Sequence, residues 1–186
     1  AKYGAMAVAI LFFGLTANFF RDPDRVTPAG ERHIIAPADG KIVEVRQVAE
    51  HEFLHDRATQ ISIFMSPLNV HVNRVPISGS VRHTRYVRGE YFAAYEDKAS
   101  EKNEQMHIGV ENGFGKVFFK QIAGFVARRI VCPLKVGDTV TAGERFGMIK
   151  FGSRVDVFVP ANTDVKVTVG ETAVAGETVL ADFHER

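Results

Sequence analysis

The sequence has no tryptophan, only one cysteine and almost no net charge. A lone cysteine, Cys132, cannot form an intrachain disulfide, and a zinc ribbon or a CxxC redox site needs at least one more. The 23 basic and 22 acidic residues leave a formal net charge of +1, which gives no general attraction to nucleic acid, so we expect no nucleic-acid partner. The histidines show no spacing typical of a ligand set, so we also expect no metal.

The remaining composition is typical of one globular domain of moderate size. The chain has 186 residues, of which 46% are hydrophobic and 24% are charged. These values argue against a disordered acidic tail and against a polytopic membrane protein. The chain is long enough to bury a sizeable core.

One long uncharged run stands near the start of the chain. Residues 4–20 read GAMAVAILFFGLTANFF and are followed at once by Arg21 and Arg25. The run is slightly shorter than the about 20 residues that cross a bilayer, it has no polar face, and phenylalanines crowd its C-terminal half. We therefore interpret residues 1–25 as a hydrophobic helix that associates with the cell membrane on its cytoplasmic side, either peripherally or as an anchor. The alternative is a core helix packed against the rest of the chain.

Residues 26–186 have the pattern of a β-rich domain. Short stretches of alternating polar and apolar residues are separated by Gly, Pro, Asn and Asp, and no long amphipathic helix competes with them. Residues 91–105 are polar and weakly patterned, and we expect a loop there. The predicted strands are residues 41–48, 60–64, 80–87, 116–122, 127–132, 154–159 and 164–169.

A short motif occurs twice in the C-terminal half. VGDTVTAGERF begins at Val136 and VGETAVAGETV begins at Val169. Each copy places glycines where a tight turn needs a positive φ, which predicts two similar hairpin-like units packed face to face. Together with APADGKIVEV at residues 36–45, the repeat resembles the barrel-sandwich fold of biotinyl and lipoyl carrier domains. We therefore expect a mainly β fold with a barrel-sandwich core and an N-terminal hydrophobic helix.

The dipeptide Gly152–Ser153 lies between two strand-like runs. A glycine before a serine at such a junction permits a sharp turn that brings the hydroxyl close to the preceding carbonyl carbon. The serine oxygen can then attack its own peptide bond. From these two residues alone, however, a plain turn is the simpler interpretation.

Six short motifs give this dipeptide a context. In chain order they are FFRDP (19–23), PADG (37–40), MSPLNVHVNRVP (65–76), KNEQ (102–105), QIAGFVARRIV (121–131) and FGMIKFGSRVDV (146–157). Their order and spacing resemble phosphatidylserine decarboxylase in its short bacterial and archaeal form, over nearly the whole chain.

This resemblance implies an inactive precursor that cuts itself between Gly152 and Ser153. An N-to-O acyl shift and β-elimination would produce chains 1–152 and 153–186 and convert Ser153 into a pyruvoyl group. That group would form a Schiff base with the amine of phosphatidylserine and release carbon dioxide, giving phosphatidylethanolamine. The implied partners are phosphatidylserine, a membrane surface, the two cleaved chains themselves and a second copy in a homodimer.

The resemblance also assigns two further catalytic residues. His71 is the expected general acid–base, and on a strand over residues 69–75 it would share a face with Asn73 and Val75. Asp39 is the expected processing carboxylate, although aspartate is also common on turns for structural reasons. The long bacterial form has a second histidine where this chain has Arg74, which is no base at neutral pH. Three possibilities remain open for the activation of Ser153. His71 serves both self-cleavage and decarboxylation, or Asp39 acts directly or through water, or Arg74 only stabilises negative charge.

Substrate binding requires cationic and polar donors. Arg128 and Arg129 are candidates for the phosphodiester, and at most one of them can point inward on a strand. Asn103 and Glu104 match a family motif, where they would contact the substrate or order the loop.

The alternative function is a non-enzymatic lipoyl- or biotinyl-like carrier module modified at Lys150, although MIKFG lacks the flanking pattern of either modification site.

Overall fold

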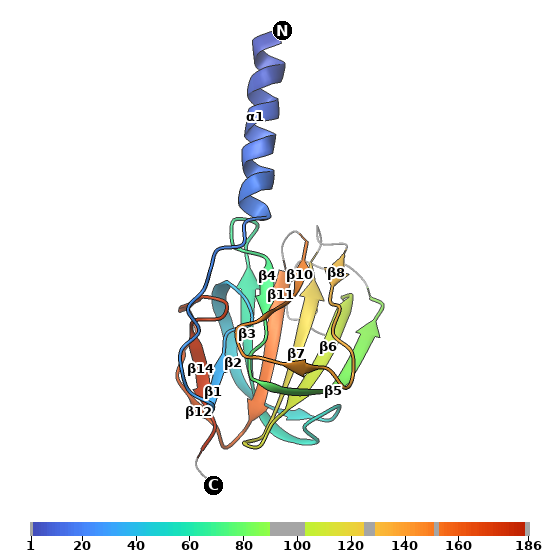
Figure 1. The fold of residues 1–186 in the computed structure, drawn as a ribbon, viewed down its shortest axis with the longest axis vertical. Coiled ribbons are helices and arrows are strands. Elements are labelled where there is room, and N and C mark those ends of the chain that lie inside the picture. The colour runs from blue at the N-terminus through green and yellow to red at the C-terminus, as the bar shows by residue number, and fades with distance from the viewer. Residues whose placement is uncertain (1, 90–102, 125–128, 151–152, 185–186) are drawn as a thin grey trace.

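An N-terminal helix projects from a body of antiparallel strands (Figure 1). The computed structural model describes residues 2–89, 103–124, 129–150 and 153–184. Within these ranges the chain forms helix α1 (Lys2–Phe19) and fourteen strands in three sheets. The prediction of a mainly β fold with an N-terminal helix is confirmed. The finer barrel-sandwich assignment stays a prediction.

The largest sheet has eight strands, and each neighbouring pair is antiparallel. In spatial order they are β13 (Thr172–Ala173), β2 (Gly40–Glu50), β3 (Asp56–Met65), β11 (Ser153–Pro160), β7 (Lys116–Ala123), β6 (Gln105–Glu111), β5 (Gly79–Val87) and β9 (Thr139–Val140).

Two three-stranded sheets complete the body. One has the order β1 (His33–Ile35), β14 (Val179–Asp182) and β12 (Asp164–Val165). The other has the order β4 (Val72–Arg74), β10 (Arg145–Ile149) and β8 (Ile130–Val131). Figure 1 shows this second sheet at the end of the body nearest to α1.

Strand β11 is buried on both faces. Val155, Val157 and Val159 point into the main hydrophobic core and are fully buried. On the opposite face, Phe158 joins a smaller aromatic cluster. On the same face as Phe158, Arg154 donates to the carboxylates of Asp156 at 2.6 Å and Glu44 at 2.7 Å, so its charge is compensated inside the protein. The strand that begins at Ser153 is therefore held from both sides.

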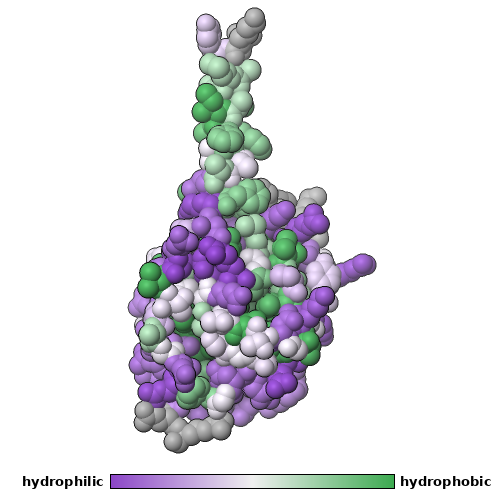
Figure 2. Space-filling view, viewed as in Figure 1, coloured by the Kyte–Doolittle hydropathy of each residue, from purple (hydrophilic) through white to green (hydrophobic). Residues whose placement is uncertain are grey.

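Helix α1 does not pack against the body, so the alternative of a core helix is wrong. Its side chains from Tyr3 to Ala17 are exposed, and only Phe19 at its last position is buried. Figure 2 shows the helix as an exposed, predominantly hydrophobic rod. Within the described residues, no helix has both the length and the hydrophobicity required to span a membrane.

The two repeat copies have the same backbone. Gly137 and Gly170 both have φ of 100°, and Gly143 and Gly176 have φ of 81° and 79°, which confirms the predicted positive-φ turns. The hairpin expectation is wrong, because the two strands of each copy pair with different partners: β9 with β5 and β10 with β4, β13 with β2 and β14 with β1.

Five of the seven predicted strands are confirmed nearly at full length, as β2, β3, β5, β7 and β11. The other two are shorter: β8 covers only Ile130–Val131 and β12 only Asp164–Val165. Strand β6 was not predicted, because its buried side chains give a nearly continuous run rather than an alternation. Most of the predicted loop 91–105 lies outside the described residues.

Candidate active site

Ser153 lies where three central strands end together. It pairs with Met65, the last residue of β3, and with Ala123, the last residue of β7. Its side chain is fully buried, and its hydroxyl donates a hydrogen bond to the Met65 sulfur at 3.2 Å. A thioether is only a weak acceptor, so it positions the hydroxyl without removing its proton. Gly152, on the other side of the predicted cleavage point, lies outside the described residues.

Two buried side-chain amides extend the hydrogen-bond chain beyond Met65. Asn73 of β4 donates to the Met65 sulfur at 3.8 Å and to the Pro37 carbonyl at 3.3 Å. Gln121 of β7 donates to the Asn73 side-chain oxygen at 2.8 Å. In the sequence, Asn73 was predicted to share a face with His71 and Gln121 belongs to a family motif, but neither residue was assigned a role. Their polarity within otherwise apolar strands was the available signal.

His71 is fully buried just before β4. Its Nδ1 lies 2.9 Å from the Asn69 carbonyl oxygen. A carbonyl only accepts hydrogen bonds, so Nδ1 carries the proton and Nε2 of the neutral ring carries the lone pair. The Phe19 ring covers the imidazole with its centroid 4.1 Å away. This arrangement presents a base with one free nitrogen.

The charge state of His71 follows from its surroundings. Burial lowers the pKa of His71 below its usual value, and the positive charge of Arg21 lowers it further. The Asn69 carbonyl and the negative charge of Asp39 oppose this shift and raise the pKa. Because the net shift is downward, His71 is neutral at physiological pH and able to accept a proton.

The buried polar atoms that lack a partner concentrate in this region. Among the described residues they are Arg25 Nε, His71 Nε2 and Gln121 Oε1. Buried polar groups are rarely left without a hydrogen bond. Gln121 connects to Ser153 through Asn73 and Met65, and Arg25 binds Asp39. The unsatisfied atoms thus surround the predicted catalytic residues, which is typical of a functional site.

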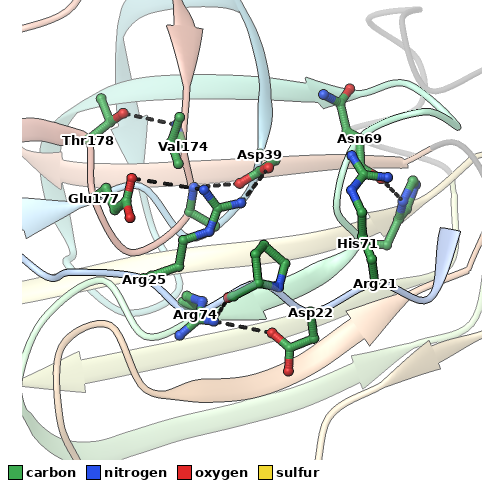
Figure 3. Close-up of polar contacts among 12 residues, drawn as sticks. Arg21, Asp22, Arg25, Asp39, Asn69, His71, Arg74, Val174, Glu177 and Thr178 are labelled. Atoms are coloured by element: carbon green, nitrogen blue, oxygen red, sulfur yellow. Dashed lines mark hydrogen bonds and ion pairs between the residues drawn. The ribbon is translucent and has the colours of Figure 1, made fainter. Parts of the chain in front are cut away.

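Asp39 lies on the turn before β2, as predicted, and both of its carboxylate oxygens are engaged. Oδ1 accepts the Ala175 backbone N–H at 2.8 Å, and Oδ2 accepts Arg25 at 2.9 Å (Figure 3). Ser78, on the corresponding turn before β5, accepts the Ala142 N–H at 2.9 Å in the same way. Asp39 therefore has a structural function on its turn, and it acts on His71 through its charge.

Arg74 is not placed to substitute for a second histidine. Its guanidinium donates to the Gly143 carbonyl at 3.0 Å, to the Pro23 carbonyl at 3.0 Å and to Asp22 at 3.2 Å. Figure 3 shows it directed toward Asp22, which precedes the segment that carries Arg25. Arg74 fastens the chain after α1 to the body.

The predicted substrate-binding residues fall in different places. The Asn103 side chain donates to the Ala123 carbonyl at 2.7 Å, and the Glu104 carbonyl accepts the Ala123 N–H at 2.9 Å, so both residues fasten the strand end beside Ser153. Arg129 is exposed before β8, and Arg128 lies outside the described residues. Lys150 follows β10, and its backbone N–H donates to the Arg129 carbonyl at 3.2 Å.

No group of three or more His, Cys, Asp or Glu side chains within the described ranges is arranged to hold a metal ion. Glu52 accepts hydrogen bonds from His83 and His107, at 2.8 and 2.9 Å, and from Arg85 at 2.7 Å. Both oxygens of this carboxylate already accept hydrogen bonds, so the cluster is an internal hydrogen-bond network rather than a ligand set.

Comparison with known proteins gives consistent matches over nearly the whole chain. Residues 12–181 match the model of the family described as phosphatidylserine decarboxylase. The chain is 53% identical to the phosphatidylserine decarboxylase proenzyme of Chlorobium luteolum, over 94% of this chain and 81% of the relative. It is 51% identical to the proenzyme of Pelodictyon phaeoclathratiforme, over 95% and 81%, and 49% identical to that of Chlorobium phaeobacteroides, over 95% and 82%.

Proposed function

Since the chain belongs to the phosphatidylserine decarboxylase family, whose members are pyruvoyl-dependent lyases, we propose that it converts phosphatidylserine to phosphatidylethanolamine and carbon dioxide after cutting itself between Gly152 and Ser153. The observation that carries the proposal is the free Nε2 of buried His71, two residues before Asn73, which donates to the same Met65 sulfur that accepts the Ser153 hydroxyl. The family membership argues against the carrier module modified at Lys150.

The surroundings of Ser153 fit the prosthetic group that the family uses. A pyruvoyl group at position 153 supplies an electrophilic carbonyl and an electron sink for decarboxylation. The position is buried and bordered by Met65 and Ala123, and the unpaired Gln121 Oε1 and His71 Nε2 nearby are acceptors for a substrate amine. Ser153 and Gly152 provide the cleavage point, and Ser153 provides the group itself.

We assign the proton transfers to His71. For self-cleavage, Nε2 takes the proton of the Ser153 hydroxyl, either directly or through water. In the decarboxylation reaction, the same nitrogen returns a proton to the substrate carbon that has lost its carboxylate. Asp39 assists by its charge, which raises the basicity of His71, rather than by touching Ser153, because both of its oxygens are engaged elsewhere.

The remaining assignments concern the substrate and the membrane. Asn103 and Glu104 order the strand end beside Ser153, and one of Arg128 and Arg129 is proposed to meet the lipid phosphate as a further cation. The exposed apolar surface of α1 supports association with the cytoplasmic face of the cell membrane by residues 1–25, with residues 26–186 as the catalytic domain. A homodimer and the barrel-sandwich class of the core are part of the same proposal, and the matched repeat turns support the latter.

Intact mass spectrometry tests the cleavage. The purified protein should contain chains 1–152 and 153–186, the second with a blocked N-terminus that reacts with hydroxylamine, and the two should co-elute under native conditions because β11 lies between β3 and β7. The Ser153→Ala variant should remain one chain without decarboxylase activity. A wild-type protein that stays intact and yields no carbon dioxide from phosphatidylserine would refute the proposal.

A further inference from the structure

An apolar groove lies where the C-terminal end of α1 meets the loop after β3. Its apolar walls are formed by Phe12, Leu15, Phe19, Phe20, Pro67 and Leu68. Leu68 is 66% exposed and Phe20 is 46% exposed, so the groove opens to the surface of the protein. Exposed apolar side chains in one continuous patch indicate a binding surface for an apolar ligand.

Arg21 bridges two of the residues that line this groove. Its guanidinium donates to the Asn18 carbonyl of the helix at 2.7 Å and to the Leu68 carbonyl of the loop at 2.8 Å. Both partners are neutral, and Arg21 has no carboxylate partner among the described residues. By contrast, Arg25 pairs with Asp39, and both Arg74 and Arg145 pair with Asp22. Arg21 therefore keeps an uncompensated positive charge and unused N–H donors.

The groove is separated from His71 by the Phe19 ring. This ring lines the groove, and its centroid lies 4.1 Å from that of the imidazole. Two consecutive backbone carbonyls of one loop accept hydrogen bonds from the two polar side chains. The Leu68 carbonyl accepts from Arg21 and the Asn69 carbonyl accepts from His71. Arg21 is also close enough for its charge to lower the pKa of His71. The apolar groove, the cation and the candidate base thus lie next to one another.

We propose, as an extension of the proposed function, that Arg21 binds the phosphodiester of phosphatidylserine while the groove between α1 and residues 67–68 holds the beginning of one acyl chain. In the lipid, the phosphate stands between the acyl chains and the serine, and Arg21 likewise contacts Leu68 of the groove and lies close to His71. A guanidinium matches two phosphate oxygens at once. The serine carboxylate is the less suitable anion, because a cation holding it would stabilise the ground state that decarboxylation has to leave.

Binding of a monomeric short-chain lipid to the uncut Ser153→Ala chain tests the cation. Dihexanoyl phosphatidylserine below its micelle concentration requires no membrane docking, and calorimetry reports its Kd. Arg21→Gln in this background should weaken binding about tenfold or more, the usual loss for a hydrogen bond to a charged group. Arg57→Gln is the matched control, because Arg57 is exposed at the opposite end of β3 from Met65, and its Kd should not change.

Two further ligands identify which part of the lipid is bound. Dihexanoyl phosphatidylethanolamine retains the phosphate but has no carboxylate, and Arg21→Gln should weaken its binding by the same factor. Retained affinity for this lipid would assign Arg21 to the carboxylate and overturn the phosphate assignment. Glycerophosphoserine has no acyl chains, so Leu68→Ser should weaken binding of the dihexanoyl lipid only, whereas Leu11→Ser, on the helix but outside the groove, should affect neither ligand.

The proposal and the function on which it rests can fail separately. Suppose that the wild type cleaves itself and is active. If Arg21→Gln then changes neither the Kd of the uncut chain nor the KM of the mature enzyme, only the Arg21 assignment is overturned. If Arg21→Gln loses its native circular dichroism spectrum, Arg21→Lys replaces it. This variant keeps the charge but not the two-pronged guanidinium, so an unchanged Kd for both lipids would equally overturn the proposal.

Discussion

At the scale of single residues, the proposed function assigns the proton transfers to His71. His71→Gln keeps a polar side chain but removes the base, so self-cleavage should slow by about 100-fold or more. A variant that is cut but inactive would restrict His71 to decarboxylation, and one that is cut and active would contradict the assignment. His33→Gln, which removes a histidine paired with Asp182, is the control, and gel electrophoresis over time measures cleavage.

The same residue sets the pH dependence of cleavage. Because the pKa of His71 is lowered, its basic form persists to more acidic pH than that of a free histidine. The rate of self-cleavage should therefore stay constant down to about pH 6.5, the usual histidine pKa, and decline only below it. Arg21→Gln removes a charge that lowers this pKa, so the decline should begin at higher pH. Cleavage half-times between pH 5 and 8 measure both curves.

The sequence was informative about the residues with a family counterpart and about little else in the site. Ser153, His71 and Asp39 could be named in advance, and their burial or turn position agrees with those assignments. Gln121 could not, because its importance comes from an oxygen without a hydrogen-bond partner, and Arg21 could be named only as one of two cations beside the hydrophobic run, because its lack of a carboxylate partner is visible only in the fold. Such absences are properties of the packed structure and have no signature in the chain.

At the scale of elements, the turn glycines of the two repeat copies differ in the space around them. At Gly170 an added Cβ would meet no atom within 4 Å, so Gly170→Ala adds only backbone strain from φ of 100°, about 1–2 kcal/mol. At Gly143 the Cβ would also overlap Thr27 Oγ1, only 1.9 Å away, which adds about 1–3 kcal/mol. Urea unfolding in the Ser153→Ala background should rank the variants in this order, and equal losses would contradict it.

Helix α1 is the element whose surface has no partner within the described structure. Ile10 and Phe13 are 64% and 73% exposed, and burying each in lipid is worth about 1.5–3 kcal/mol. The double variant Ile10→Ser and Phe13→Ser should therefore lower binding to anionic lipid vesicles at least about tenfold in co-sedimentation. Val136→Ser and Val169→Ser, at exposed positions of the body, should bind as the wild type does. Equal binding by both pairs would remove α1 from the interaction.

At the scale of the whole molecule, two neutral buried histidines predict acid lability. Burial is the main cause that lowers the pKa of both His71 and His107, and Lys120 and Arg85 add to it at His107 against the opposing Glu52. The unfolded chain then binds more protons than the folded one below about pH 6.5, so the free energy of unfolding should fall as the pH falls from there. Urea denaturation at several pH values measures the slope, and His107→Gln should reduce it.

The sequence predicted the β-rich class of the whole molecule but not its strand order. Alternating residues gave β2, β3, β5, β7 and β11 because each of these strands is long enough to show its own pattern. The pairing of β11 with β3 joins Ser153 to Met65, 88 positions apart, and no local pattern encodes such a partner. Strands of two or three residues, such as β9 and β13, depend entirely on those distant contacts.

The position of β11 in the middle of the large sheet has a consequence for how the enzyme can be produced. Once the chain is cut before Ser153, the central strand belongs to one molecule and its neighbours β3 and β7 to another. Unfolded precursor can find its native pairing within a single polypeptide, at a rate that does not depend on dilution. The two cleaved chains have to meet in solution first, so their refolding yield after denaturation should depend on protein concentration. Once cut and unfolded, the protein therefore does not readily return to its native state in dilute solution.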